Sequence, residues 1–192
     1  MPHIKVDENL PGIRSLMAFS PQTAAPMGEL ANLLLRTNEG LSMTERELIG
    51  TYVSHLNDCF YCMHSHGAIV TCYLNDGNEL VDQVIDDLDH APLSDKMRAL
   101  LAIAGSAQKN GKLVTAEQVE TAWKCGATDR DIHDTVLITA AFCMFNRYVD
   151  GLASNTPTDL SSYPLRARQI ADNGYGNHIF INKQPVPDEQ QA

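Results

Sequence analysis

The chain lacks the segments that mark a membrane-spanning or a secreted protein. No stretch approaches the roughly 18 consecutive apolar residues that a spanning helix needs. The amino-terminal run MPHIKVDENLPG has no apolar core of signal-peptide length. We therefore expect a cytoplasmic protein that has no membrane partner.

Positive charge is scarce as well. The sequence has 14 Lys and Arg residues against 24 Asp and Glu residues, which gives a net charge of −10. The acidic residues are scattered, and their densest group is Asp86, Asp87 and Asp89. Because a phosphate backbone attracts clustered cations and repels such a chain, we expect no nucleic-acid partner.

Segments that alternate apolar and polar residues with a period of two, as β-strands do, are also missing. Helical spacing is present instead, for example at Met97, Leu100, Leu101 and Ala104 behind a capping Ser94. A chain of 192 residues with 44% hydrophobic content is long enough for one domain with a substantial core. These features predict an all-α fold with a single compact domain over residues 1–155.

Cap residues and apolar periodicity predict the limits of the helices. The expected helices run from Pro26 to about Asn38, from Ser42 or Thr44 to about Leu56, from Cys59 to Asn75, from Glu79 to Leu88, from Ser94 to Asn110, from Thr115 to Cys125 and from Thr128 to about Ala153. Residues 10–20 are expected to be an apolar entry segment. Residues 156–192 are expected to be a loop-rich extension with one helical turn near Leu165 to Asn173, packed on the domain or on a neighbouring subunit.

Two parts of the chain echo each other at a shift of 52 residues. The matched positions are Leu41 with Leu93, Ser42 with Ser94, Arg46 with Arg98 and Leu48 with Leu100. In the second copy, Ala99 takes the place of Glu47 and Gly111 takes the place of Cys59. We interpret this as helical hairpins with a possible internal duplication, in which only the first copy carries a site.

The five cysteines have no spacing that suggests a framework of disulfides, but Cys59 and Cys62 form a CxxC pair. In a chain without a signal peptide, such a pair indicates redox chemistry or metal binding. At a helix start the two thiols lie one turn apart on one face, and His66 lies one turn beyond Cys62. A free thiol titrates near ~8.5 and reacts as the thiolate, so a helix start and a nearby imidazole favour reactivity.

Glu47 lies twelve residues before Cys59, on the preceding helix. From there its carboxylate could pair with His66, fix the tautomer of the imidazole and stabilise its cationic form. Two capping boxes fit the start of this helix, Ser42 with Glu45 and Thr44 with Glu47. If the second one forms, the Glu47 carboxylate binds backbone N–H groups and takes no part in a relay.

Further residues are candidates to line the site or to support it. The candidates for lining are His55, Tyr61 and His64. A zinc site would add His64 and Cys72 to the cysteine pair and His66. Since all of these lie on one expected helix, where four ligands cannot converge on one tetrahedron, we expect no bound metal. A late polar cluster, Asn146, Arg147, Tyr148 and Asp150, is expected to make structural hydrogen bonds or an ion pair.

The constellation resembles the motif of the alkylhydroperoxidase-D-like proteins in the carboxymuconolactone decarboxylase superfamily. The residues that carry this resemblance are Glu47, Ser54, Asn57, Cys59-Phe60-Tyr61-Cys62 and His66. The segments LPGIRSLMAFSP and FCMFNRYVDGLAS resemble the peroxidase-related branch. The resemblance covers roughly residues 10–160 and implies that Glu47 and His66 form a proton relay, while Cys59 and Cys62 cycle between dithiol and disulfide.

The function that this implies is a thiol peroxidase for hydrogen peroxide or organic hydroperoxides. In the expected cycle Cys62, which shares a face with His66, attacks the peroxide and becomes a sulfenic acid, and Cys59 condenses with it to a disulfide. The reverse order stays open, because in many CxxC proteins the amino-terminal cysteine is the more exposed and more acidic one. An external dithiol or a protein reductant resets the pair, with no haem, flavin or metal cofactor. The resemblance also implies a homo-oligomer, a trimer or a hexamer.

Three alternatives stay open. They are a thiol-disulfide oxidoreductase acting on a protein partner, a lyase like carboxymuconolactone decarboxylase, and a zinc-binding module.

Overall fold

The computed structural model describes residues 1–37, 39–74 and 79–175. In these residues all regular secondary structure is helical. The α-helices are α1 (Ile13–Phe19), α2 (Pro21–Leu35), α3 (Met43–Leu56), α4 (Phe60–Leu74), α5 (Glu79–Asp86), α6 (Asp95–Lys109), α7 (Ala116–Lys124), α8 (Asp129–Gly151) and α9 (Pro164–Asn173). Two 3₁₀ turns, η1 (Gly111–Leu113) and η2 (Leu160–Ser162), complete the set. The absence of strands from these residues confirms the predicted all-α class.

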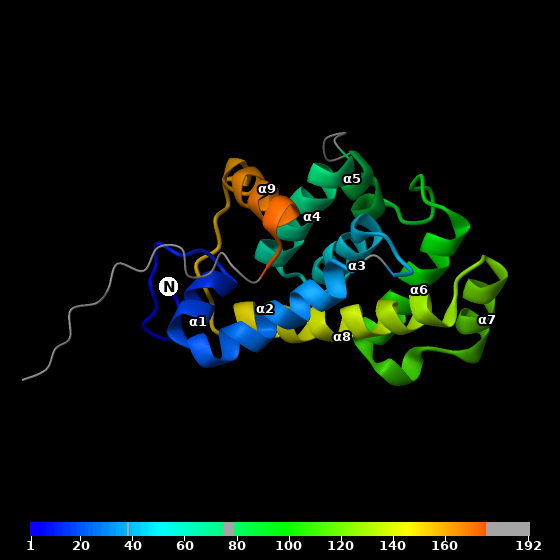
Figure 1. Ribbon diagram of the computed structural model, residues 1–192, viewed down its shortest axis with the longest axis horizontal. Coiled ribbons are helices and arrows are strands. Elements are labelled where there is room, and N and C mark those ends of the chain that lie inside the picture. Colours follow the sequence, from blue (N-terminus) through cyan, green and yellow to red (C-terminus); the bar gives the residue numbers. More distant parts are fainter. Residues whose placement is uncertain (38, 75–78, 176–192) are drawn as a thin grey trace, which may run out of the picture.

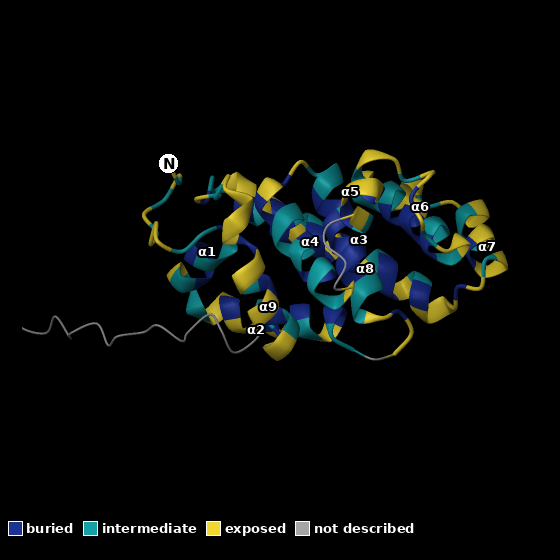
Figure 2. Cartoon of the chain, turned by 90° about the horizontal axis from the view of Figure 1, so that it is seen from above, coloured by how far each residue is buried: buried dark blue, intermediate teal, exposed yellow. Residues whose placement is uncertain are grey.

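Helix α3 lies at the centre of the molecule (Figure 1). Helices α4 and α8 pack against it, α1 and α2 lie at one end, and α6 and α7 lie at the other. Helix α9 comes back from the carboxyl-terminal part of the chain and lies along α4. Buried residues concentrate in α3 and on the inner faces of its neighbours, as the second view shows (Figure 2). This arrangement places the α3–α4 hairpin inside the protein.

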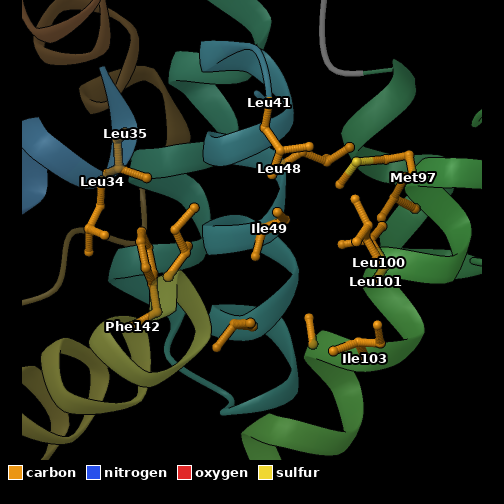
Figure 3. Close-up of a cluster of buried hydrophobic side chains, with 14 of the residues drawn as sticks. Leu34, Leu35, Leu41, Leu48, Ile49, Met97, Leu100, Leu101, Ile103 and Phe142 are labelled. Carbon is orange, nitrogen blue, oxygen red and sulfur yellow. The ribbon is translucent and has the colours of Figure 1, made fainter. Parts of the chain in front are cut away.

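The core converges on α3 from three sides (Figure 3). Leu48 and Ile49 of α3 are 2% and 0% exposed. Side chains from α2 contact them on one side and side chains from α6 on the other. Phe142 of α8 approaches α3 at Gly50, where a Cβ would lie only 2.2 Å from the aromatic ring. The missing side chain at Gly50 therefore lets α8 pack closely on the hairpin.

The amino-terminal part is more helical than the sequence predicts. Residues 13–19 of the expected entry segment form α1, and α2 begins at Pro21 instead of Pro26. Pro21 occupies the first helical position, where its missing N–H costs nothing. Pro26 is the sixth residue of α2, so it removes one early backbone hydrogen bond without ending the helix. The prediction was wrong because both prolines fit a helix start and the local pattern does not distinguish them.

The predicted starts of the later helices are confirmed. Ser94 caps α6, accepting a hydrogen bond from the backbone N–H of Met97, and Thr115 and Thr128 form capping boxes at α7 and α8. Helix α8 ends at Gly151, two residues before the expected end. The expected stop at Asn75 to Gly77 lies outside the described residues. None of the described helices combines the length and the apolarity that crossing a lipid bilayer requires.

The described part of the carboxyl-terminal extension, up to Tyr175, packs on the domain. Helix α9 is longer than the single turn expected there, and it begins with Pro164 at its first position. Ala167 and Ile170 of α9 are buried against Ile69 of α4. The remainder of the predicted extension, residues 176–192, lies outside the described residues.

Candidate active site

The start of α3 decides what Glu47 can do. Ser42 is the N-cap, its side chain accepts from the N–H of Glu45, and its own N–H donates to the Glu45 carboxylate at 2.8 Å. The capping box is therefore the one with Glu45, and Glu47 is left out of it. The Glu47 side chain, two residues further along the helix, is completely buried. A buried carboxylate needs partners from elsewhere in the fold.

His66 of α4 is one of these partners. Its Nδ1 lies 2.7 Å from Oε2 of Glu47, which joins the two helices of the hairpin. Phe142 packs on the imidazole, with ring centroids 4.6 Å apart and the planes nearly perpendicular. A carboxylate only accepts, so Nδ1 carries the hydrogen and Nε2 is left with its lone pair. The histidine thus has the tautomer of a general base.

Tyr175 is the second partner of Glu47, and nothing in the sequence pointed to it. Its hydroxyl donates to Oε1 of Glu47 at 2.5 Å and lies 3.2 Å from Nδ1 of His66. Burial and the Glu47 carboxylate raise the pKa of Tyr175 well above its usual value, so the phenol stays protonated. Glu47 therefore receives one hydrogen bond on each oxygen.

The backbone around Tyr175 holds this residue in place. Its N–H donates to Oδ1 of Asn32 at 2.7 Å. Gly174 has a φ of +82°, and a Cβ there would lie 2.7 Å from the same Asn32 oxygen. Arg36 donates to the carbonyls of Ile170 and Ala171 at the end of α9. Contacts from α2 and from Arg36 just after it thus fix the segment that brings Tyr175 to the Glu47–His66 pair, and only the folded chain reveals them.

The two cysteines of the CxxC pair lie at the start of α4. Asp58 adopts a left-handed conformation with φ of 57°, and the next N–H, that of Cys59, donates to the carbonyl of Ser54. Cys59 immediately precedes α4, and its carbonyl accepts the N–H of Met63. Cys59 is 1% exposed and Cys62 is 3% exposed, and all five cysteines are thiols. The pair is therefore inside the protein.

The two thiols have different surroundings. The neighbouring Cys62 side chain, then burial, and then a hydrogen bond to Asp150 raise the pKa of Cys59 far above its usual value. Partial burial raises the pKa of Asp150, and the nearby Asp58 carboxylate raises it further. The hydrogen bond with Cys59 lowers this pKa but does not outweigh the other two effects. Cys59 is thus held as a neutral thiol beside acidic groups.

A cavity of about 150 Å³ is lined by Cys62 but not by Cys59. His66, Tyr175 and Tyr61 also line it, and most of its remaining wall is apolar. Burial raises the pKa of Tyr61 to about 12, so this phenol is also neutral. A small molecule in this cavity would meet the Cys62 thiol and the histidine together.

His64 and His55 are placed away from this cavity. His64 lines a second, more open hollow together with Cys72 and packs against the Phe60 ring, with centroids 4.1 Å apart. Burial lowers the pKa of His64, and Asp82 opposes this shift. His55 lies half-buried near the end of α3 and lines neither hollow. Among the described residues, no three Cys, His, Asp or Glu side chains converge as metal ligands would.

The motif residues Ser54 and Asn57 support the turn before Cys59. Asn57 donates to Oδ1 of Asn146 at 2.7 Å, and Nδ2 of Asn146 donates to the Ser54 hydroxyl. Gln108 of α6 donates to Oδ1 of Asn57. The predicted structural hydrogen bonds of the late polar cluster are thus present at Asn146, and Asp150 of the same cluster reaches Cys59.

The chain is similar to known proteins in sequence and in fold. The model of the carboxymuconolactone decarboxylase family matches residues 21–71, a range that includes Glu47, both cysteines and His66. No curated protein matches the chain. A solved structure of a peroxidase-related protein from Ralstonia eutropha JMP134, described as an alkylhydroperoxidase AhpD core, is 28% identical with a TM-score of 0.72. The match covers 78% of each chain.

A second solved structure, a peroxidase-related protein from Silicibacter sp. TM1040, is equally similar. It is 28% identical, its TM-score is 0.72, and the match covers 80% of this chain and 78% of that chain. Both neighbours extend the similarity far beyond the 51 residues of the family match, to most of the fold.

Proposed function

Since the chain belongs to the alkylhydroperoxidase-D-like group of the carboxymuconolactone decarboxylase superfamily, we propose that it is a cysteine-dependent peroxidase. The observation that carries this proposal is the buried Glu47–His66 pair, whose histidine lines a small cavity that Cys62 also lines. Solved structures described as peroxidase-related proteins have the same fold.

In the first step, His66 takes the proton of the Cys62 thiol on Nε2, and the Glu47 carboxylate stabilises the imidazolium. The thiolate attacks the terminal oxygen of the hydroperoxide, the O–O bond breaks, and Cys62 becomes a sulfenic acid. His66 returns its proton to the leaving alkoxide, which departs as the alcohol or, from hydrogen peroxide, as water. Cys62 is oxidised by two electrons and the peroxide is reduced by two.

In the second step, the sulfur of Cys59 attacks the sulfur of the Cys62 sulfenic acid. The S–O bond breaks, a disulfide forms, and the hydroxide leaves with the Cys59 proton as water. Asp150, which is in contact with the Cys59 thiol, is placed to carry this proton. A dithiol reductant then returns both residues to thiols and is itself oxidised to a disulfide.

The burial of both sulfurs favours a peroxide over a protein disulfide as the oxidant. Cys59 and Cys62 are 1% and 3% exposed, so a folded protein partner has almost no access to either sulfur. A peroxide needs only to enter the cavity that Cys62 lines. The same burial leads us to expect that a small dithiol can act as reductant.

The test is peroxide consumption with dithiothreitol as the reductant, for hydrogen peroxide and for cumene hydroperoxide. We expect Cys62→Ser to lower kcat/KM at least about 1,000-fold, because the nucleophile is removed. Cys59→Ser should retain a single turnover and leave a sulfenic acid that dimedone labels on Cys62, detected by peptide mass spectrometry. Cys125→Ser, far from the pair in sequence and half-buried at the end of α7, is the control and should behave as wild type.

Peroxide turnover that survives in both the Cys59→Ser and Cys62→Ser variants would contradict the thiol cycle. Dimedone labelling of Cys59 in Cys62→Ser, with rapid peroxide consumption, would reverse the roles of the two thiols.

A further inference from the structure

Two arginines line the same cavity as Cys62. Arg14 comes from α1 and Arg166 from α9, so separate parts of the chain bring them together. Both side chains are half-buried. No Asp or Glu is among the described residues that line this cavity, although the whole chain carries a net charge of −10. The two guanidinium groups are thus the charged side chains that this lining contributes, while the Glu47 carboxylate behind it is already bound by His66 and Tyr175.

These two arginines lack the partners that the other arginines of the core have. Arg46 and Arg98 bind backbone carbonyls, whereas the guanidinium of Arg14 makes no hydrogen bond or ion pair within the described part of the chain. Among the same residues, the guanidinium of Arg166 donates only to Gln169, at 3.4 Å. Burial, and then the nearby Arg14, lower the pKa of Arg166, as expected for two like charges that line one cavity. An anion between them would relieve this repulsion.

The rest of the wall is suited to a small apolar body. Met17, Met27, Leu35, Ile69 and Phe145 form much of it. The volume of about 150 Å³ equals that of an apolar protein cavity that holds one benzene molecule. An aromatic ring, or a branched alkyl group of similar size, would therefore fill the space between the arginines and Cys62.

We propose that the cavity binds the hydroperoxide of a small aromatic or branched-alkyl carboxylic acid, with the carboxylate held by Arg14 and Arg166 and the peroxide facing Cys62. A carboxylate suits this position because guanidinium groups bind it through paired hydrogen bonds, and because a larger anion would leave no room for the ring. The assignment rests on the peroxidase function proposed above, and it names the substrate class.

The first experiment measures binding without turnover. Calorimetric titration of the reduced protein compares 4-isopropylbenzoate with the neutral, nearly isosteric 4-isopropylbenzamide. We expect the benzoate to bind at least about tenfold more tightly, because hydrogen bonds to a charged group are worth that much. Arg14→Gln and Arg166→Gln should each reduce this preference. Arg168→Gln is the matched control, since Arg168 is an exposed residue of the same helix that lines only the second hollow.

The second experiment uses turnover. Wild type should prefer the para-carboxylate derivative of cumene hydroperoxide over cumene hydroperoxide itself by about tenfold in kcat/KM. In the Arg14→Gln, Arg166→Gln double variant this ratio should fall to near one, while Arg168→Gln keeps the ratio of wild type.

The outcomes separate the two proposals. If wild type binds the benzoate and the benzamide with equal affinity, the inference is overturned, whatever the activity. This comparison uses wild-type protein alone, so it does not depend on the folding of any variant. A preference that Arg14→Gln, Arg166→Gln and the double variant all retain also overturns it. Benzoate binding that depends on the arginines, with no consumption of either hydroperoxide, supports the anion site and overturns the peroxidase function.

Discussion

The starts of α3 and α6 are built alike. Ser42 and Ser94 are the N-caps, and each hydroxyl accepts from the N–H three residues later. Four residues after each cap stands an arginine, Arg46 in α3 and Arg98 in α6, and both donate to carbonyl oxygens of the loop just before their helix. The echo in the sequence thus corresponds to the same way of fixing a loop to a helix start.

The difference lies in the next residue. Glu47 comes after Arg46 and accepts hydrogen bonds from His66 and Tyr175, whereas Ala99 comes after Arg98 and packs on the hydrophobic core. At the position that matches Cys59, the second copy has an exposed Gly111. The capped helix start therefore occurs with and without a candidate active site. The residues of that site follow the helix start, and only the first copy has them.

The two arginines should differ most in their contribution to stability. Arg46 is 1% exposed, binds three carbonyls and pairs with Asp134 at 2.7 Å, whereas Arg98 binds two carbonyls at a half-buried position. We expect Arg46→Met to lower the free energy of unfolding by about 3–5 kcal/mol, the usual effect of breaking a buried ion pair. Arg98→Met should cost about 1–2 kcal/mol, measured for both by urea unfolding.

The gap between these two variants should depend on pH. Burial would raise the pKa of Asp134, but hydrogen bonds from His133, Arg130 and Arg46 outweigh it and lower this pKa below the ordinary 3.8. The folded state therefore favours the ionised carboxyl, so its contribution is present above pH 3.8 and is lost as the pH falls through the lowered pKa. Equal costs of Arg46→Met and Arg98→Met at pH 7 would show that the two helix starts are equivalent.

A smaller effect is expected when the relay carboxylate loses its charge. Glu47→Gln keeps the shape and an acceptor for Nδ1 of His66 but cannot stabilise the imidazolium. We expect kcat/KM for cumene hydroperoxide to fall about 100-fold, at the lower end of losses in acid–base catalysis. Tyr175→Phe removes one hydrogen bond from the same carboxylate, and a fall of about fivefold is expected.

The control for this comparison is Glu45→Gln on the same helix. Glutamine can replace glutamate in a capping box, and Glu45 lies outside the cavity, so activity should stay at the level of wild type. If Glu45→Gln and Glu47→Gln lowered kcat/KM equally, the loss would come from a disturbed α3 and not from the relay. A loss in Tyr175→Phe with the same pH profile as wild type would mean that the hydroxyl only fills space.

Local rules predicted the parts of the site that lie within one hairpin. The spacing of Cys59, Cys62 and His66 placed them at the start of one helix, because one helical turn sets that geometry. The role of Glu47 stayed open, because Ser42 with Glu45 and Thr44 with Glu47 satisfy the same capping rule. Only the fold chose between them, by burying Glu47 against α4.

Contacts between distant segments could not be predicted in this way. Tyr175 reaches Glu47 across 128 residues, and its position depends on Asn32 and on the left-handed Gly174. Arg14 and Arg166 likewise meet only after α9 has folded back onto α4. No periodicity or cap encodes such contacts, because they depend on the path of loops and on side-chain packing. Helix α9 itself was underestimated, since its apolar face is short and is buried only on α4.

The smallest expected effect concerns the shared scaffold itself. Ser42→Ala and Ser94→Ala each remove the hydrogen bond from a backbone N–H to the cap hydroxyl at an exposed helix start, so each should cost about 1 kcal/mol in urea unfolding. Ser42→Ala also removes the bond that its hydroxyl donates to the exposed Glu45 carboxylate. The two costs should agree within about 0.5 kcal/mol, although α3 has the fuller capping box, because the Glu45 carboxylate keeps its bond to the backbone N–H at position 42 after the substitution. Peroxide consumption should change in neither variant. A cost at Ser42 that exceeds the one at Ser94 by more than about 1 kcal/mol, together with lower activity, would show that the start of α3 is part of the site and that only α6 is pure scaffold.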